Sequence, residues 1–268
     1  MDKNCIGLKS DQVSSDVSPR ERVRQALAHR TLPRVPFSWG FGPTPEMTRE
    51  LQAYMAERGI EWDALQTFTD DIRGIAPKYI GPALPPDTDI WGIVRQSQSY
   101  GTGHYDEITH YPLAGIQSPE ALDAYPWPDP DAYDYEHFRE QVFEADPEPL
   151  KARKLAIDTC GNPFEIYCWM TGLEEALVNV LLNPELVHAA LTRITDFFAA
   201  KLERALDRVA DLVDLCYFAD DLGGQQTLLM SRETYRAILQ PYHARLFQRA
   251  KALAPQVAVM YHSDGAVF

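Results

Sequence analysis

The segment Tyr217-Phe-Ala-Asp-Asp-Leu-Gly-Gly-Gln-Gln226 follows an apolar run, and Tyr261-His-Ser-Asp-Gly265 follows a second one later in the chain. Each segment places polar side chains at the end of a strand-like stretch, and a helix-like stretch separates the two. In proteins that alternate strands and helices, the carboxyl ends of parallel strands share one rim, and the active site lies there. The pattern therefore favours an α/β enzyme with site residues in these two segments.

The sequence around these segments continues the alternation. Strands are predicted at residues 155–160, 212–218 and 257–261. Helices are predicted at residues 172–183, 184–210 and 231–254, the last with a break at Pro241. Strands that are separated by helices pair in parallel through right-handed crossovers. The carboxyl-terminal half is thus expected to be a parallel sheet with helices packed on it.

The amino-terminal part begins with a strong helix signal. In Ser18-Pro-Arg-Glu21 a serine N-cap precedes proline at the first helical position, with glutamate three residues on. A helix is therefore predicted to run to about residue 29, after a loose tail at residues 1–17. A short strand is predicted at residues 35–39. Thr44-Pro45 is expected to open a second helix.

The middle of the chain is predicted to leave the main sheet. Residues 73–80 form a strand candidate, and residues 90–96 and 104–110 read as a hairpin joined through Gly101-Thr-Gly103. Tyr125-Pro-Trp-Pro-Asp-Pro130 excludes regular helix or inner strand, because proline lacks the amide donor and restrains its predecessor. We expect one domain over residues 18–268, with a hairpin excursion near residues 90–110.

Composition excludes several classes of partner. The 25 basic and 39 acidic residues give a net charge of −14, which disfavours nucleic acid and anionic lipid as partners. No run approaches the roughly 20 apolar residues of a membrane span, and the first 17 residues lack the apolar centre of a signal peptide. The four cysteines include no C-x-x-C pair. A cytoplasmic protein acting on a small molecule is predicted.

A set of ordered motifs resembles the uroporphyrinogen decarboxylase superfamily. The motifs are Pro19-Arg-Glu-Arg-Val-Arg-Gln-Ala-Leu27, Arg34-Val-Pro36, Asp89-Ile-Trp-Gly92, His110-Tyr-Pro-Leu113, Tyr125-Pro-Trp-Pro-Asp129, Gly161-Asn-Pro-Phe-Glu165, Asn183-Pro-Glu185, Asp220-Asp-Leu-Gly223, Gln240-Pro-Tyr242 and His262-Ser-Asp-Gly265. The resemblance covers residues 18–268 and implies a (β/α)8 TIM barrel. The superfamily contains porphyrinogen decarboxylases and zinc-dependent methyltransferases that work with corrinoid proteins or thiols.

The decarboxylase branch of this superfamily matches the sequence less well. Its substrate carries eight carboxylates, which suit guanidinium groups, and the resemblance places an arginine-rich segment after the first strand. Here that segment is Ser38-Trp-Gly-Phe-Gly-Pro43, with no basic residue. The catalytic aspartate of the family corresponds to Asp71 or Asp70, and a family tyrosine corresponds to Trp169. Porphyrinogen decarboxylation is therefore kept as the alternative function.

The methyltransferase branch is implied by the second polar segment. Its thiol-directed members use a His-x-Cys pair to bind zinc, and here His262 is kept while Asp264 takes the cysteine position. Residues two apart on a strand point the same way, and a nitrogen and oxygen site suits zinc. Glu165 is the candidate for a third ligand or supporting acid. The alternatives are a structural, hydrogen-bonded His262 and a helix-capping Asp264.

These considerations give a set of predicted site residues. Asp221, His262 and Glu165 are the predicted catalytic residues, with Asp221 preferred over its neighbour because adjacent side chains on an extended chain diverge. The side chains predicted to contact substrate are Trp39, Phe41, Asp71, Trp169, Asp220 and Gln225. The predicted reaction is metal-assisted methyl transfer involving a thiol or a corrinoid protein, with zinc as the cofactor.

The end of the chain leads to a further expectation. Residues 257–261 correspond to about the sixth barrel strand, so the barrel is expected to lack its last strands. An open barrel leaves an unpaired strand edge. We expect a fragment, an early-terminated product or one part of an assembly, such as a homo-oligomer, in which another subunit covers that edge. A non-catalytic binding module is the second alternative function.

Overall fold

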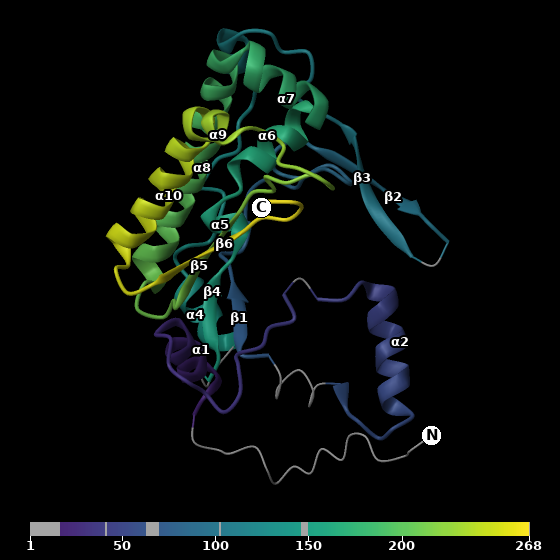
Figure 1. The fold of residues 1–268 in the computed structure, drawn as a ribbon, viewed down its shortest axis with the longest axis vertical. Coiled ribbons are helices and arrows are strands. Elements are labelled where there is room, and N and C mark those ends of the chain that lie inside the picture. The colour runs from purple at the N-terminus through teal and green to yellow at the C-terminus, as the bar shows by residue number, and fades with distance from the viewer. Residues whose placement is uncertain (1–16, 41, 63–69, 102, 146–149, 268) are drawn as a thin grey trace.

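A four-stranded parallel sheet forms the centre of the molecule. The computed structural model describes residues 17–40, 42–62, 70–101, 103–145 and 150–267. The sheet consists, in spatial order, of β1 (Ile72–Ile75), β4 (Ala152–Leu155), β5 (Leu215–Ala219) and β6 (Ala258–His262). Each neighbouring pair is parallel, so the carboxyl ends lie together (Figure 1). The predicted parallel α/β sheet is confirmed, and the eight-stranded barrel stays a prediction.

The helices of the carboxyl-terminal part are α5 (Ile157–Cys160), α6 (Pro163–Thr171), α7 (Leu173–Leu182), α8 (Pro184–Val209), α9 (Arg232–Ile238) and α10 (Gln240–Leu253). Helices α8 and α10 lie along one side of the sheet, and α6 and α7 lie beyond the carboxyl ends of its strands (Figure 1). The long helix α8 packs against α5, α6, α7 and α10. Its buried apolar residues, which include Leu191 and Leu202, form much of the core. The helix break predicted at Pro241 is confirmed, since Leu239 separates α9 from α10.

Three strand predictions were wrong in whole or in part. The candidate at residues 73–80 is a strand only over Ile72–Ile75, and it joins the main sheet rather than leaving it. The strand predicted at residues 155–160 ends at Leu155, and the chain turns there because the Thr159 and Cys160 amides donate to the carbonyl of Ala156. A short apolar run cannot distinguish a strand from a buried helical turn. Residues 35–39 form no strand, because the Phe37 amide donates to the side chain of Asp71 rather than to a neighbouring strand.

Helix α1 (Pro19–Leu27) closes the amino ends of the strands. As predicted, the Ser18 hydroxyl accepts a hydrogen bond from the Glu21 amide. Arg20 and Arg24 both form ion pairs with the carboxylate of Asp214, which directly precedes β5, at 2.9 and 2.8 Å. The basic residues of this motif therefore attach the helix to the sheet on the rim opposite the strand carboxyl ends.

Other elements lie outside the sheet. Strands β2 (Val94–Ser99) and β3 (His104–His110) form the predicted antiparallel hairpin, which projects from the body (Figure 1). The remaining described helices are α2 (Pro45–Ala56), the 3-10 helix η1 (Pro119–Ala124) and α4 (Phe138–Ala145). None of the helices in the described ranges combines the length and apolarity needed to cross a membrane.

The turn at Asp89–Gly92 connects the excursion to the core. The Asp89 carboxylate accepts hydrogen bonds from the amides of Trp91 and Ile93, at 2.9 and 3.1 Å. Gly92 has a φ of +74°, which a residue with a side chain rarely adopts. The turn thereby buries Trp91, whose ring packs edge-on against Phe197 at 4.9 Å between centroids.

Candidate functional site

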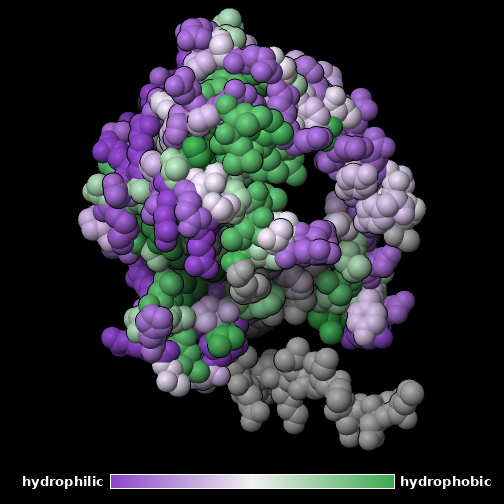
Figure 2. All heavy atoms as spheres, turned by 45° about the horizontal axis from the view of Figure 1, so that its top comes forward, coloured by the Kyte–Doolittle hydropathy of each residue, from purple (hydrophilic) through white to green (hydrophobic). Residues whose placement is uncertain are grey.

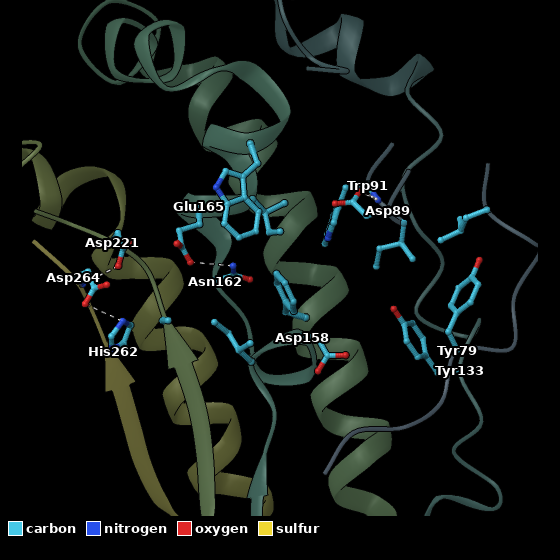
Figure 3. A pocket seen from close by; sticks show the side chains of 17 residues that line it. Tyr79, Asp89, Trp91, Tyr133, Asp158, Asn162, Glu165, Asp221, His262 and Asp264 are labelled. Carbon is cyan, nitrogen blue, oxygen red and sulfur yellow. Dashed lines mark hydrogen bonds and ion pairs between the residues drawn. The ribbon is translucent and has the colours of Figure 1, made fainter. Parts of the chain in front are cut away.

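A cavity of about 610 Å³ opens next to the carboxyl ends of β4, β5 and β6. Its size lies within the usual range for small-molecule sites. Figure 2 shows that the molecule is hollowed on this side, with hydrophobic side chains gathered beside the hollow. Its wall combines acidic and aromatic side chains, many of which are labelled in Figure 3. Among the described residues that line the cavity, none is lysine or arginine.

One end of the cavity holds Asp221, His262 and Asp264 (Figure 3). Asp221 follows β5, and His262 is the last residue of β6. One potential ligand atom from each residue lies within 4.8 Å of the others. The Asp264 amide donates to Asp221 Oδ1 at 2.7 Å, and His262 Nε2 lies 3.3 Å from Asp264 Oδ1. We call these three residues the acid triad. One imidazole and two carboxylates form a donor set suited to a divalent metal.

Glycines allow the two loops of the acid triad to approach each other. A side chain on Gly223 would place its Cβ 2.7 Å from the Ala266 amide nitrogen and 2.8 Å from the Gly265 carbonyl carbon. The Leu222 amide donates to the Ser263 hydroxyl, and the Ala266 amide donates to the Gly224 carbonyl, both at 2.9 Å. The triad therefore depends on backbone contact between the loops that follow β5 and β6.

Gly223→Ala is expected to separate these loops. The added methyl group would meet backbone atoms, which cannot move as a flexible side chain can, so we expect a loss of about 1–3 kcal/mol in the free energy of unfolding. Gly224→Ala is the matched control, because its Cβ would lie 3.4 Å or more from its neighbours. Urea unfolding of both variants measures the difference, and equal stability would contradict the proposed close packing.

Glu165 lies on the cavity wall near the start of α6. Its carboxylate accepts a hydrogen bond from the Asn162 side-chain amide at 3.1 Å. Burial raises the pKa of Glu165 to about 7, the Asn162 hydrogen bond opposes the rise, and the negative charges of Asp220, Asp221 and Asp264 add to it. A carboxyl group with a pKa near neutral pH can both donate and accept protons.

Asp220 is fully buried and holds the Glu165 backbone in place. Its Oδ1 accepts from the Glu165 amide at 2.7 Å, and its Oδ2 lies 2.6 Å from His243 Nε2. Tyr235 contacts the other ring nitrogen of His243 at 3.2 Å. Burial raises the pKa of Asp220, and the hydrogen bond with His243 opposes that rise. The predicted divergence of the two adjacent aspartates is therefore observed, with Asp221 on the cavity and Asp220 in the core.

The raised pKa of Glu165 predicts a pH-dependent stability. Between its ordinary value of 4.5 and about 7, the folded protein binds more protons than the unfolded protein, so the free energy of unfolding falls as pH rises. The full difference would be about 3 kcal/mol, and the partly exposed side chain reduces it to about 1–3 kcal/mol. Urea unfolding of metal-free protein at pH 5 and pH 8 measures it. Glu165→Gln should remove most of this change, and an unaltered pH dependence would contradict the assignment.

Among the described residues that were predicted to contact substrate, only Trp169 lines the cavity. The Arg95 guanidinium lies 5.2 Å from the centroid of the Trp169 ring. Trp39 packs against Phe37 and Trp62 and does not line the cavity. Gln225 is exposed on the loop after β5, outside the cavity wall. Phe41 lies outside the described residues.

Asp71 lies on the opposite rim, just before β1. Its buried carboxylate pairs with Arg22 and Arg34 and accepts from the Phe37 amide at 2.8 Å. It does not line the cavity. Asp71, which the family pattern implies as a catalytic residue, therefore binds the amino-terminal segment to the sheet in this protein. Its neighbour Asp70 accepts from the Ile72 amide at 3.2 Å.

Sequence reasoning missed several residues of the cavity. Asp158 was placed inside a predicted strand, whereas the early end of β4 brings it to the cavity wall. Asn162 belongs to the Gly161-Asn-Pro-Phe-Glu165 motif, which was the signal that could have identified it. Tyr133 lies beyond the proline-rich connector, and nothing in its local sequence indicates a position next to Asp158.

Comparisons with known proteins agree with this architecture. The solved structure of a methyltransferase from Methanosarcina mazei has a TM-score of 0.54 and 14% sequence identity, over 94% of this chain and 71% of that chain, which shows a shared fold. No curated protein matches the chain. The family model "Uroporphyrinogen decarboxylase (URO-D)" matches residues 114–268, which include the acid triad and Glu165. Because this match spans more than half of the chain, the protein belongs to the uroporphyrinogen decarboxylase (URO-D) family.

Proposed function

We propose that this protein is a metal-assisted methyltransferase that acts on a small molecule in the cavity beside the acid triad. The observation that carries the proposal is the convergence of Asp221, His262 and Asp264, whose potential ligand atoms lie within 4.8 Å of one another in the cavity wall. The methyltransferase from Methanosarcina mazei shares the fold and makes this reaction class a reasonable choice. A thiol or a corrinoid protein is the proposed methyl acceptor or donor.

The acid triad would hold the metal through His262 Nε2 and the carboxylates of Asp221 and Asp264. This donor set fits zinc, because zinc accepts imidazole and carboxylate ligands. When bound, zinc would supply Lewis acidity, which lowers the pKa of a thiol or hydroxyl nucleophile or activates a leaving oxygen. The backbone contact at Gly223 keeps the two ligand-bearing loops together.

Glu165 is the proposed proton carrier. With a pKa of about 7 in the absence of metal, its carboxyl group is divided between both protonation states at neutral pH. It can accept the proton that a thiol loses when it becomes a nucleophile. Alternatively, it can protonate the oxygen of the methyl donor when the bond between that oxygen and the methyl group breaks. Asp220 fixes the Glu165 backbone through a hydrogen bond, which keeps this carboxyl near the triad.

The charges of the cavity wall disfavour porphyrinogen decarboxylation. A substrate with many carboxylates needs cationic partners, whereas the described wall contains no lysine or arginine and includes Asp89, Asp158, Glu165, Asp221 and Asp264. A purely passive binding module would have no use for a carboxyl group whose pKa lies near neutral pH beside a potential metal site. Both alternatives are therefore less consistent with the site than methyl transfer.

The test is a methyl-transfer assay on the purified protein loaded with zinc. Candidate methyl donors are incubated with a thiol or with free cob(I)alamin, and the methylated product is measured by mass spectrometry. We expect zinc-dependent product formation that Glu165→Gln reduces. Absence of product with every donor and acceptor, together with absence of metal binding, would contradict the proposal.

A further inference from the structure

The cavity has a second polar end, which the proposed chemistry does not use. In Figure 3, Asp158 and Tyr133 lie on the side of the cavity away from His262. Behind them lies Lys201 of α8, which is fully buried. Its ammonium donates to the Asp158 carbonyl oxygen at 2.8 Å and to Asp158 Oδ2 at 3.2 Å. The same nitrogen lies 3.6 Å from the centroid of the Tyr133 ring, so one ammonium joins both cavity-lining residues.

Tyr133 offers a hydrogen-bond donor to the cavity. Only 7% of the residue is exposed, and it forms part of the cavity wall. Burial and the charge of Asp158 raise the pKa of Tyr133, so the phenol stays protonated. The ring is fixed edge-on to Tyr79 at 5.5 Å between centroids. A phenol that is fixed in the cavity wall can donate a hydrogen bond to a ligand group at this position.

Asp158 offers acceptors at the same end. Its side chain is 55% exposed, and its carboxylate accepts from Lys201 and, at 3.3 Å, from the Thr159 hydroxyl. A carboxylate has about four acceptor sites, so others remain for a ligand. The positive charge of Lys201 balances the negative charge of Asp158. The subsite therefore combines one donor and one acceptor with no net charge.

We propose that Asp158 and Tyr133 bind a neutral hydroxyl group of the substrate, and that Lys201 sets the charge selectivity of this subsite. The hydroxyl would donate to Asp158 and accept from Tyr133. An anionic group would be repelled by Asp158, and a cationic group by the buried Lys201. Tyr79 and Trp91 line the same region with aromatic rings, which suits a flat apolar body. This inference deepens the proposed function, because it names the substrate class as a hydroxyl-bearing aromatic or alkyl compound.

The experiment measures binding of four small probes to the metal-free protein by isothermal titration calorimetry. The probes are phenol, toluene, benzoate and benzylammonium. We expect phenol to bind most tightly. Tyr133→Phe, which removes only the hydroxyl, should weaken phenol binding about fivefold to tenfold and leave toluene binding unchanged. Equal binding of phenol and toluene, or an unchanged phenol affinity in Tyr133→Phe, would overturn the proposal.

Two further variants test the charge balance. In Lys201→Met the Asp158 carboxylate loses its counter-charge, so benzylammonium should gain at least about tenfold relative to phenol. In Asp158→Asn the ammonium of Lys201 keeps its positive charge but loses its counter-charge, so the affinity for benzoate should increase relative to the affinity for phenol. Each ratio is measured within one variant, which separates selectivity from a general loss of folding. If Lys201→Met does not fold, the benzoate-to-phenol ratio of Asp158→Asn still tests the charge balance of the subsite. Unaltered ratios would overturn the role of Lys201.

The two proposals can fail separately. These binding measurements use neither metal nor methyl donor, so absence of methyl transfer does not affect their outcome. Tight phenol binding without methyl transfer would retain the hydroxyl subsite and reject the reaction. Methyl transfer without preference for the hydroxyl probe would retain the reaction and reject the subsite.

Discussion

His262→Ala is expected to weaken zinc binding by at least about 100-fold. The imidazole is the single nitrogen ligand of the acid triad, and its loss leaves the carboxylates of Asp221 and Asp264. Mutating a group that merely orients a metal ligand already costs about 10–100-fold in affinity, so removal of the ligand itself should cost more. Competition with a chromogenic zinc chelator measures the dissociation constant. The same variant should lose zinc-dependent methyl transfer.

His137→Ala is the matched control for this prediction. His137 also lies next to a carboxylate, with its Nδ1 3.1 Å from Asp134 Oδ1, but His137 is 66% exposed and no second carboxylate completes a triad among the described residues. We expect zinc affinity to stay within about twofold of the unmodified protein, since a single exposed pair binds metal weakly. Equal zinc affinity of the two variants would show that the metal binds elsewhere and would remove the basis of the proposed reaction.

The rim that carries the triad could be predicted from local sequence because polar residues follow two apolar strands directly, but the third potential ligand atom comes from Asp221 rather than from Glu165, which was the predicted third ligand. Parallel strands place such residues on one rim. The two-residue spacing predicted that His262 and Asp264 share one side, but β6 ends at His262, and Asp264 is instead held by the hydrogen bond from its amide to Asp221 Oδ1. The same alternation predicted that Asp221 and Asp220 diverge, and the structure places only Asp221 on the cavity. The shared rim follows from polar residues placed after apolar strands, a pattern that is visible in one sequence.

The remaining site features depend on contacts between distant segments. Lys201 and Asp158 are 43 residues apart in the chain, and their pairing requires α8 to pack on α5. Asp71 resembles a catalytic residue in its local sequence, but Arg22 and Arg34 reach it from elsewhere and bind its carboxylate. Neither outcome follows from periodicity or spacing, because tertiary packing decides which charged groups meet.

Asp214→Ala is expected to lower the free energy of unfolding by about 2–4 kcal/mol. The carboxylate is 3% exposed and binds Arg20, Arg24 and, at 3.0 Å, the buried backbone amide of Arg153. Breaking a buried ion pair typically costs about 3–5 kcal/mol. Arg20 and Arg24 are partly exposed and can regain water, which reduces the cost, whereas the Arg153 amide would lose its acceptor. Urea unfolding followed by tryptophan fluorescence measures the change.

Asp211→Ala is the control, because Asp211 also pairs with an arginine but is 64% exposed. Exposed ion pairs contribute about 0–1 kcal/mol, so this variant should remain close to the unmodified protein. Asp214 lies at the amino ends of the strands and the acid triad at their carboxyl ends. We therefore expect folded Asp214→Ala to bind zinc normally, since the amino rim of such folds serves stability and the carboxyl rim serves chemistry. Stability equal to that of Asp211→Ala, or zinc affinity reduced as in His262→Ala, would contradict this division.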